Sequence, residues 1–339
     1  MVKGPAVPRR DCKAPRVDAP GSELLPHALA SRRRLSDRIG DTALQVLTGL
    51  AAIGSVVIVG LIGYRLVYGA WPAIQKFGIA FVWHKAWDPV TSHFGALDFL
   101  YGTAVTSFAA VLIAGPLAIA IALFLTELAP PAVRGVIGSL VEMLAAVPSV
   151  VLGLWGIFVL GPFVRDHIDP WLQSWFGWIP LFSGTPQQAG LLPAILILTI
   201  MIVPITASIS RELFKSVPPE LKEGAYGLGL TRWEMVRGVI VPYTRGGIVA
   251  AVLLGMGRAV GEAIAVTQVI GGFTGIPTSL FAPGDTLASR IAEQYQSAVS
   301  NIHVSAIIYL ALILLVFALL TNLGAQVIVN RFESQKRGS

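Results

Sequence analysis

The sequence predicts an all-α integral membrane protein with six transmembrane helices. Of its 339 residues, 54% are hydrophobic and only 13% are charged, whereas soluble domains carry about 25% charged residues. Six apolar stretches are each long enough to cross about 30 Å of hydrocarbon at about 1.5 Å per residue. Lysine and arginine are distributed unevenly between the segments that connect these stretches. These features exclude an ordinary soluble globular domain.

The predicted spans follow a basic N-terminal tail, residues 1–42, in which we expect disorder and then a short interfacial segment near Arg32 to Arg38. A six-span domain over residues 43–330 and a short tail over residues 331–339 complete the chain. Prolines inside the spans predict kinks, because neighbouring helices in a bundle satisfy the carbonyls that a proline leaves free. The spans cover approximately Ala43–Val67, Gly102–Thr126, Val136–Val164, Ala189–Ile209, Gly246–Ile270 and Val304–Val329.

The positive charges predict the orientation of these spans. Nineteen of the 25 Lys and Arg residues lie on one side of the predicted topology, five lie on or near the other side, and Arg258 lies inside a span. Cytosolic segments of membrane proteins are enriched in Lys and Arg. We therefore expect a multi-pass protein of the cytoplasmic membrane, with both termini and the loop of residues 211–245 in the cytosol.

The outer segments are rich in tryptophan. Trp171, Trp175 and Trp178 lie close together in one of them, and three more lie in another. Tryptophan is typical of the interface between membrane and water, so an interfacial belt is the first interpretation. The alternative is that these segments form a platform for an external partner.

The cytosolic loop is predicted to contain two short helices. Prolines in Ser216-Val-Pro-Pro-Glu220 are typical of a helix start, because the first turn needs no amide donors. Glycines 227 and 229 predict the end of that helix. Thr231-Arg-Trp-Glu234 is a capping box that predicts a second helix, which we expect to end at Pro242. Such a hairpin either only connects two spans or fits a groove on a cytosolic protein.

The fifth predicted span carries an arginine and a glutamate near its middle. Gly257, Gly261 and Ala265 recur every four residues and predict a face for close helix packing. Arg258 and Glu262 are also four residues apart. An ionised side chain at this depth costs on the order of 3 kcal/mol, so it needs a partner or a function. The two groups either form an ion pair that fixes packing or line a path in which an oxyanion competes with Glu262 for the guanidinium.

A second acidic candidate for the translocation path lies early in the third predicted span. Glu142 is only about one to two turns from the predicted cytosolic boundary, so its side chain is also able to reach water. Pro148 follows it and predicts a kink that would suit a gate.

The cytosolic loop resembles the EAA loop of ABC importer permeases. The resemblance is carried by Glu223-Gly-Ala-Tyr-Gly-Leu-Gly229, nine further residues, and Val239-Ile-Val-Pro242. The family pattern has Glu-Ala-Ala, three residues, Gly, nine residues and Ile-x-Leu-Pro. This chain has Gly224 in place of the first alanine and valines in place of Ile and Leu, with the spacing intact.

This resemblance implies a type I, MetI-like permease bundle with a cytosolic coupling helix. In the family the loop is seated on an ATPase subunit, which implies that Glu223, Ala225 and Gly229 lie at that contact. The chain lacks the G-x-x-x-x-G-K-[ST] loop that cradles phosphates in ATPases. We therefore expect a transport subunit without enzymatic activity or cofactor, and ATP and Mg²⁺ to be used by a separate subunit.

A longer resemblance extends to the PstC-type permeases of phosphate importers and covers roughly residues 43–330. It implies a heterodimer with a PstA-like permease, a dimer of PstB-like ATPase subunits, an external PstS-like phosphate-binding protein, surrounding lipid and no nucleic acid. It also implies that Arg258 and Glu262 match the intramembrane charges of the family. The matching segments are residues 223–272, Trp71–Gly78, Tyr101–Phe108, Phe124–Pro130 and Leu144–Ser149.

The residues by themselves, without the resemblance, are also compatible with other functions. The EAA loop does not encode the substrate, so a permease for sulfate, molybdate or another solute would carry the same loop. An ion-coupled secondary transporter or channel would use Arg258 and Glu262 as a charge relay and would need no ATPase. A membrane enzyme finds little support, because no further buried catalytic group accompanies these two charges. The five histidines show no metal-ligand spacing, so we expect no metal site.

Overall fold

The computed structural model describes residues 26–337, with side chains for most residues from Gly40 to Val327. The chain divides into two units, one ending at Ile62 and one beginning at Gly63, inside helix α1 (Pro26–Phe77). The described part of the first unit is therefore the N-terminal part of α1, whose apolar side chains are exposed. Of the predicted basic tail, residues 26–42 are helical, and residues 1–25 lie outside the described part.

Six segments of the described chain are long and apolar enough to cross a membrane, which confirms the predicted all-α, six-span class. Two strands of two residues each, β1 (Trp87–Asp88) and β2 (His93–Phe94), pair antiparallel and form a small β-hairpin. The six segments are Gly40–Val82, Leu97–Leu128, Ser149–Phe176, Leu191–Lys215, Arg232–Gly261 and Asn301–Gly324.

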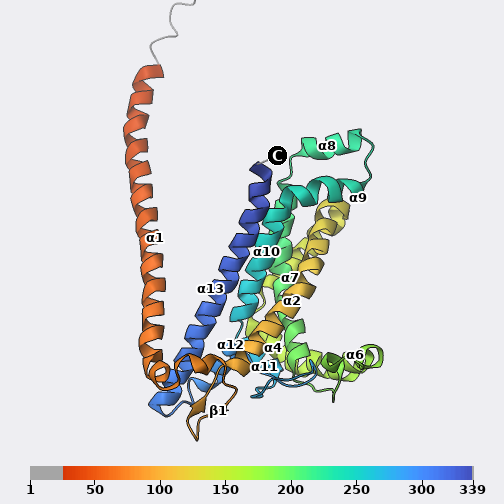
Figure 1. Ribbon diagram of the computed structural model, residues 1–339. Helices are drawn as coiled ribbons and strands as arrows, with labels where there is room; N and C mark the ends of the chain where they lie inside the picture. Colours follow the sequence, from red (N-terminus) through yellow and green to blue (C-terminus); the bar gives the residue numbers. More distant parts are fainter. Residues whose placement is uncertain (1–25, 338–339) are drawn as a thin grey trace, which may run out of the picture. The chain divides into compact units, whose positions relative to one another are not determined.

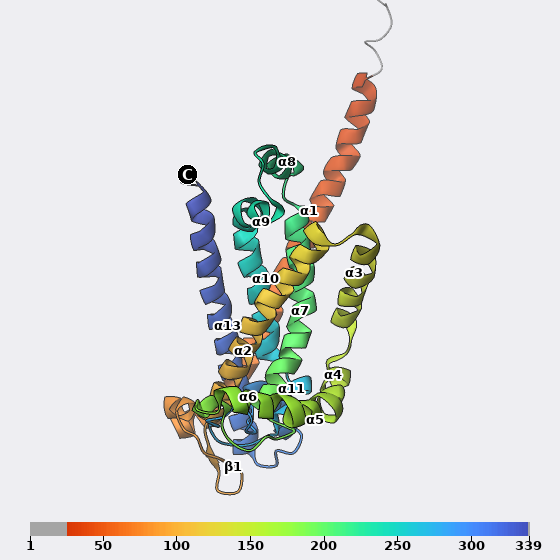
Figure 2. The same cartoon turned by 90° about the vertical axis from the view of Figure 1, so that its right-hand side faces the viewer.

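In the second unit, four long helices run alongside one another (Figures 1 and 2). They are α2 (Leu97–Leu123), α7 (Leu191–Lys215), α10 (Val241–Gly261) and α13 (Asn301–Arg337). The short helices α8 (Pro219–Gly227) and α9 (Arg232–Met235) lie at one end of this bundle. At the other end lie the hairpin, α6 (Asp169–Phe176), α11 (Ile264–Ile270) and α12 (Leu287–Gln294).

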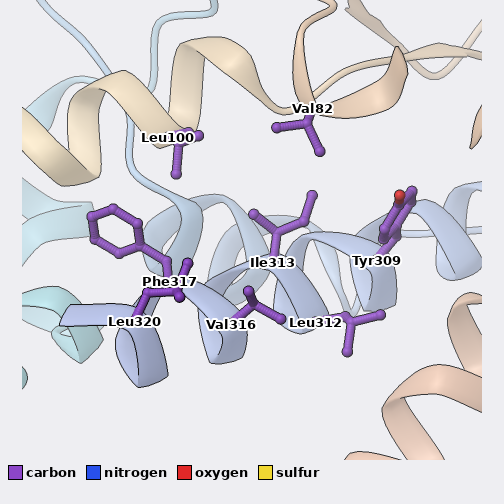
Figure 3. A pocket seen from close by; sticks show the side chains of 8 residues that line it. All are labelled: Val82, Leu100, Tyr309, Leu312, Ile313, Val316, Phe317 and Leu320. Atoms are coloured by element: carbon purple, nitrogen blue, oxygen red, sulfur yellow. The ribbon is translucent and has the colours of Figure 1, made fainter. Parts of the chain in front are cut away.

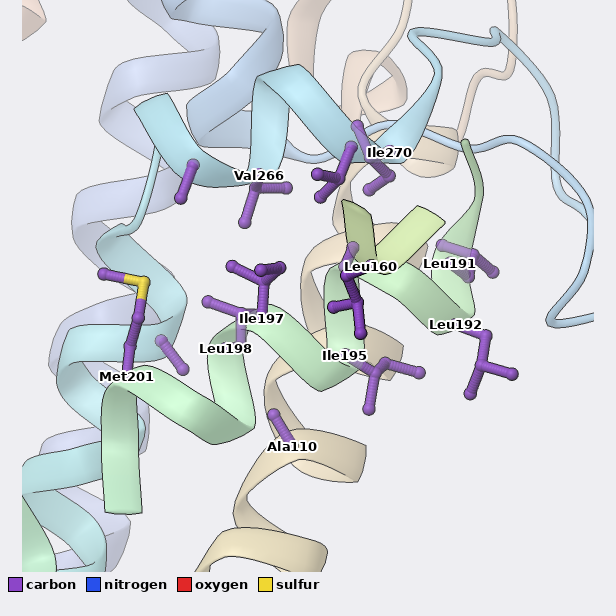
Figure 4. Close-up of a cluster of buried hydrophobic side chains, with 14 of the residues drawn as sticks. Ala110, Leu160, Leu191, Leu192, Ile195, Ile197, Leu198, Met201, Val266 and Ile270 are labelled. Atoms are coloured by element: carbon purple, nitrogen blue, oxygen red, sulfur yellow. The ribbon is translucent and has the colours of Figure 1, made fainter. Parts of the chain in front are cut away.

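The core of this unit is centred on α7. In its most apolar stretch 72% of the residues are buried, against at most 33% in the other spans, so α7 is the central helix of the bundle. Figure 4 shows Ile195, Ile197 and Leu198 of α7 among side chains of α2 and α11. Close packing of aliphatic side chains on all sides explains why α7 is apolar around its whole circumference.

The third predicted span, Val136–Val164, is broken instead of kinked. Helix α3 (Pro131–Ala146) ends before Val147, which is extended with ψ 128°, and α4 (Ser149–Trp155) begins after Pro148. A residue that precedes proline is disfavoured in the helical region, and proline also lacks the N–H that the next turn requires. The chain then continues through α5 (Gly161–Phe163) into α6, joined by wide π-helical turns.

The prediction that the second cytosolic helix ends at Pro242 is wrong. Helix α9 passes through a π-helical turn, Val236–Ile240, directly into α10, and Pro242 lies in the first turn of α10. In this turn the N–H of Val241 donates to the carbonyl of Val236, five residues back. The wider turn accommodates a residue without an N–H. The docking loop and the fifth span thus share one continuous helix.

Candidate functional site

The loop of residues 211–245 forms the two helices that its proline, glycine and capping-box residues predict. Helix α8 begins with Pro219 in its first turn and ends at Gly227, and Gly229 follows with a left-handed φ of +79°. At the start of α9, the hydroxyl of Thr231 accepts from the N–H of Glu234 at 3.3 Å. The N–H of Thr231 donates to the Glu234 carboxylate at 2.8 Å. The predicted capping box is therefore present.

Helix α8, which we call the docking helix, has two different faces. Glu223, Gly224 and Tyr226 are exposed, whereas Ala225 is only 4% exposed and packs inside the chain. The resemblance places Ala225 at the surface contacted by an ATPase, and the structure corrects this point. Its methyl group belongs to a buried apolar cluster that also includes Phe214 of α7 and Met235 of α9. The exposed Glu223 and Gly229 are free to contact a partner, and that contact stays a prediction.

A small apolar core, which we call the docking core, lies beneath this helix. Its buried members come from the ends of α2, α7 and α10 and from the loop itself, so a few residues of the loop pack against three of the spans. They are Ala122, Phe214, Val217, Ala225, Met235, Ile240 and Ile248.

The fifth predicted span, Gly246–Ile270, breaks at its glutamate. Helix α10 ends at Gly261, Glu262 is extended with ψ 115°, and α11 starts at Ile264. The Glu262 carboxylate accepts the N–H of Ala265 at 3.3 Å and so caps the first turn of α11. Arg258 lies in the last turn of α10, is exposed, and has no ion-pair or hydrogen-bond partner among the side chains that the structure describes.

The four-residue spacing of Arg258 and Glu262 does not produce an ion pair among the described side chains. The chain leaves the helix at Glu262, and the carboxylate of Glu262 accepts the N–H of Ala265. The two groups nevertheless lie on either side of one helix end, so both remain candidates for the translocation path. Arg258 presents an uncompensated guanidinium, and Glu262 uses its carboxylate to hold the neighbouring helix.

The predicted face of small residues is also interrupted. Gly257, Gly261 and Ala265 do not lie on one helix, because α10 ends at Gly261. A Cβ atom at Gly257 would lie 3.6 Å from a side-chain oxygen of α13, and one at Gly261 would meet nothing within 4 Å. The close approach occurs instead at Gly255, where a Cβ would lie 2.6 Å from the side chain of Ile202 on α7. The four-residue spacing of small residues therefore predicted the correct helix, α10, but not Gly255, the glycine at which α7 approaches.

Glu142 has a partner within the chain. Its carboxylate on α3 forms an ion pair with Arg211 on α7, beside a small cavity between these helices. The side chain of Glu142 is 56% exposed and that of Arg211 is 17% exposed. The pair fixes α3 to α7 and neutralises the carboxylate. A role of Glu142 in gating stays a prediction.

An apolar groove of about 320 Å³ lies against α13 (Figure 3). Its polar atom is the hydroxyl of Tyr309, which donates to the carbonyl of Gly78 at 3.2 Å. An anion would lose its hydration there and gain no donor, so the groove does not suit an oxyanion. Its lining residues are Val82, Leu100, Tyr309, Leu312, Ile313, Val316, Phe317 and Leu320.

The chain is similar to permeases of several organisms. It is 44% identical over 319 residues to "Phosphate transport system permease protein PstC" of Mesorhizobium japonicum, covering 92% of this chain and 98% of that protein. It is 42% identical to the protein of the same name from Pasteurella multocida, covering 91% and 97%. It is 37% identical to "Phosphate transport system permease protein PstC 1" of Mycobacterium tuberculosis, covering 83% and 85%.

Solved structures show the same fold at low sequence identity. A chain of a bacterial alginate ABC transporter matches with a TM-score of 0.55 and 17% identity, covering 86% of this chain and 97% of that one. A chain of the MetNI methionine ABC transporter matches with a TM-score of 0.50 and 17% identity, covering 68% and 93%. These likenesses confirm the MetI-type permease bundle.

A family model described as "Binding-protein-dependent transport system inner membrane component" matches residues 114–334, which include the docking helix and both intramembrane charges. The match covers more than half of the chain and agrees with the relatives and with the fold. The chain therefore belongs to the family of binding-protein-dependent transport system inner membrane components, and within it to the PstC permeases.

Proposed function

We propose that this chain is a membrane subunit of an ATP-driven importer that moves inorganic phosphate from an external binding protein into the cytosol. The observation that carries the proposal is the continuous helix from Arg232 to Gly261. Its first turns belong to the cytosolic docking element, and its last turn holds Arg258. Residues 228–231 join the docking helix to this long helix, so a displacement of the docking helix is able to reach the intramembrane arginine along one continuous helix. The names of the relatives support phosphate as the substrate.

The complete importer requires further subunits. The exposed Arg258 needs a surrounding that excludes lipid, because an unpaired guanidinium in hydrocarbon is costly. A second, PstA-like permease that encloses this side chain would form a water-filled path between the two subunits. Two PstB-like ATPase subunits would bind ATP and Mg²⁺ and contact the exposed face of the docking helix. A PstS-like protein would deliver phosphate at the outer side, with both termini of this chain in the cytosol.

The chemistry of the two charges suits a transient anion site. The guanidinium is planar and presents paired donors that match two oxygens of a phosphate. Because Arg258 has no carboxylate partner in the described chain, a passing phosphate is free to pair with it. Glu262 lies within a few residues and holds its negative charge at the cap of α11. Repulsion from this carboxylate weakens binding, so that the anion is able to leave.

Uptake of radiolabelled phosphate into vesicles that contain the reconstituted complex tests this function. We expect uptake only when ATP is inside and the binding protein is outside, and we expect excess sulfate to compete poorly. Uptake without ATP, driven by an ion gradient, would identify a secondary transporter instead. Equal uptake of sulfate would contradict phosphate as the specific substrate.

A further inference from the structure

An ion pair joins the docking helix to a spanning helix that is not its neighbour in the chain. Nζ of Lys222 on α8 is 2.6 Å from Oε1 of Glu127, which lies in the turn that continues α2 (Phe124–Leu128). The same ammonium group donates to the backbone carbonyl of Phe214 in α7 at 3.4 Å. One side chain of the docking helix thus contacts the ends of both α2 and α7.

Both members of this pair are largely withdrawn from solvent. The side chain of Lys222 is 22% exposed and that of Glu127 is 12% exposed, at the border of the docking core. Salt screens a partly buried pair less than an exposed one, and removing one partner leaves a desolvated charge. The pair is therefore a persistent contact between α8 and α2.

A second lysine–glutamate pair on the same side of the protein differs in each of these respects. Lys215 and Glu212 lie three residues apart within α7, at 2.9 Å, and their side chains are 52% and 63% exposed. An exposed pair within one helix contributes little, and it connects no second element. It provides an internal control for the effect of losing a lysine.

The path of the chain shows what the Lys222–Glu127 pair adds. The docking helix is connected covalently to α7 on one side and to α9 and α10 on the other, so its movement reaches those helices through the backbone. Helix α2 packs on α7 and α10 but is distant in sequence, and Figure 1 shows its end close to α8 and α9. Movement of the docking helix reaches α2 only through side chains, and Lys222 supplies a charged contact there.

We propose that the Lys222–Glu127 pair is the link through which movement of the docking helix is transmitted to α2, an inference that rests on the proposed function. The side chain of Lys222 is turned toward α2 and α7, whereas its neighbour Glu223, about 100° further around the helix, is exposed. An ATPase that displaces the exposed face therefore pulls Glu127 together with the ends of α7 and α10. Lys222 and Glu127 are positioning residues, and without them α2 fails to follow the other spans during the ATPase cycle.

The test compares Lys222→Met, Glu127→Gln and the exchanged pair Lys222→Glu with Glu127→Lys in the complete reconstituted complex. For each variant, ATPase co-purification, ATP hydrolysis and phosphate uptake are measured on the same vesicles. We expect co-purification and hydrolysis to stay within about twofold of wild type. We expect each single variant to need at least about fivefold more ATP per phosphate, and the exchanged pair to restore most of the coupling.

The control variant Lys215→Met should leave the ratio of ATP to phosphate unchanged. An unchanged ratio in both Lys222→Met and Glu127→Gln would overturn the proposal. Loss of ATPase co-purification in these variants would also overturn it, because the pair would then only hold the docking helix in shape. Failure of ATP-driven uptake by the wild-type complex would instead contradict the proposed function itself, so the two failures are distinguishable.

Discussion

Gly224 and Gly229 are five residues apart in the docking loop but differ in backbone conformation. Gly224 lies within α8 with ordinary helical geometry, and a Cβ there would meet no atom within 4 Å. Gly229 has a φ of +79°, a region that side chains with L chirality rarely adopt. An alanine, as in the EAA pattern, would therefore fit at position 224 without a steric clash. At position 229 the turn requires glycine.

Alanine substitutions at these two glycines should have opposite effects. Gly224→Ala should preserve ATPase binding and stabilise the docking helix by up to about 1 kcal/mol, since alanine favours helix more than glycine does. Gly229→Ala should cost about 1–2 kcal/mol in the left-handed turn and reduce ATPase co-purification. Quantitative co-purification of the two variants checks this, and equal behaviour of the pair would contradict the assigned roles.

Arg258 should be essential for uptake and dispensable for assembly. Arg258→Gln removes the charge that attracts the anion, so phosphate uptake should fall at least about tenfold, which corresponds to about 1.4 kcal/mol. Arg258→Lys should keep part of the activity, because lysine retains the charge but loses the planar pair of donors. Uptake is measured on complexes with normal subunit composition. Wild-type uptake by Arg258→Gln would show that the guanidinium has only a packing role.

At the scale of the element, α6 and the turn that follows it expose tryptophans at the end of the bundle opposite to α8. Trp171, Trp175 and Trp178 are 57%, 68% and 82% exposed, whereas Leu172, which follows Trp171 in the helix, packs against the core. Figure 1 shows α6 running across the end of the spanning helices. Residues just before α7 pack against this region, so α6 lies at the level where α7 begins. This placement favours the interfacial interpretation of the tryptophans.

Brominated lipids should therefore quench the fluorescence of these three tryptophans in reconstituted vesicles. Replacing all three by phenylalanine should remove most of the lipid-quenched signal from the outer leaflet. Trp87 is the control, because it is 8% exposed and its indole N–H donates to Gln294 at 2.7 Å. Quenching by aqueous iodide that is lost on adding the external binding protein would indicate a platform for that partner instead.

Part of this element-scale arrangement could be predicted from local signals in the sequence. The spans, the docking helix and the capping box at Thr231 follow from apolar length, proline and glycine placement, and the spacing of Thr and Glu. The break at Glu262 could not be predicted, because no proline marks it and the apolar pattern continues into α11. The continuity through Pro242 was missed for the converse reason, since a π-helical turn removes the conflict that a proline normally creates.

At the scale of the whole molecule, the ion pairs between residues distant in the chain could not be predicted from the sequence. Arg290 is one of the five positive charges that the predicted topology places on or near the outer side, and in the structure it is 5% exposed and pairs with Asp285 at 2.6 Å. Glu142 pairs with Arg211, 69 residues away, and Glu127 pairs with Lys222, 95 residues away. Such pairs depend on which helices lie side by side. Arg258 differs from these groups because the described chain offers it no partner, and this difference supports its assignment to the path.

In the proposed transport cycle an ATPase binds the docking helix, and this contact drives phosphate past Arg258. Glu223 is an exposed charge of the docking helix, and its side chain makes no contact that the fold needs. Glu223→Lys should therefore leave insertion into the membrane and assembly with the second permease intact. The same change reverses the charge of the docking face.

The most direct measurement is ATP-driven phosphate uptake by vesicles that contain the Glu223→Lys complex, compared with wild type prepared in parallel. We predict that the ATPase subunits no longer co-purify with the variant and that its uptake falls to the level seen without ATP. Normal co-purification together with normal uptake would contradict the central claim, because the docking helix would then not be where ATP hydrolysis is coupled to transport.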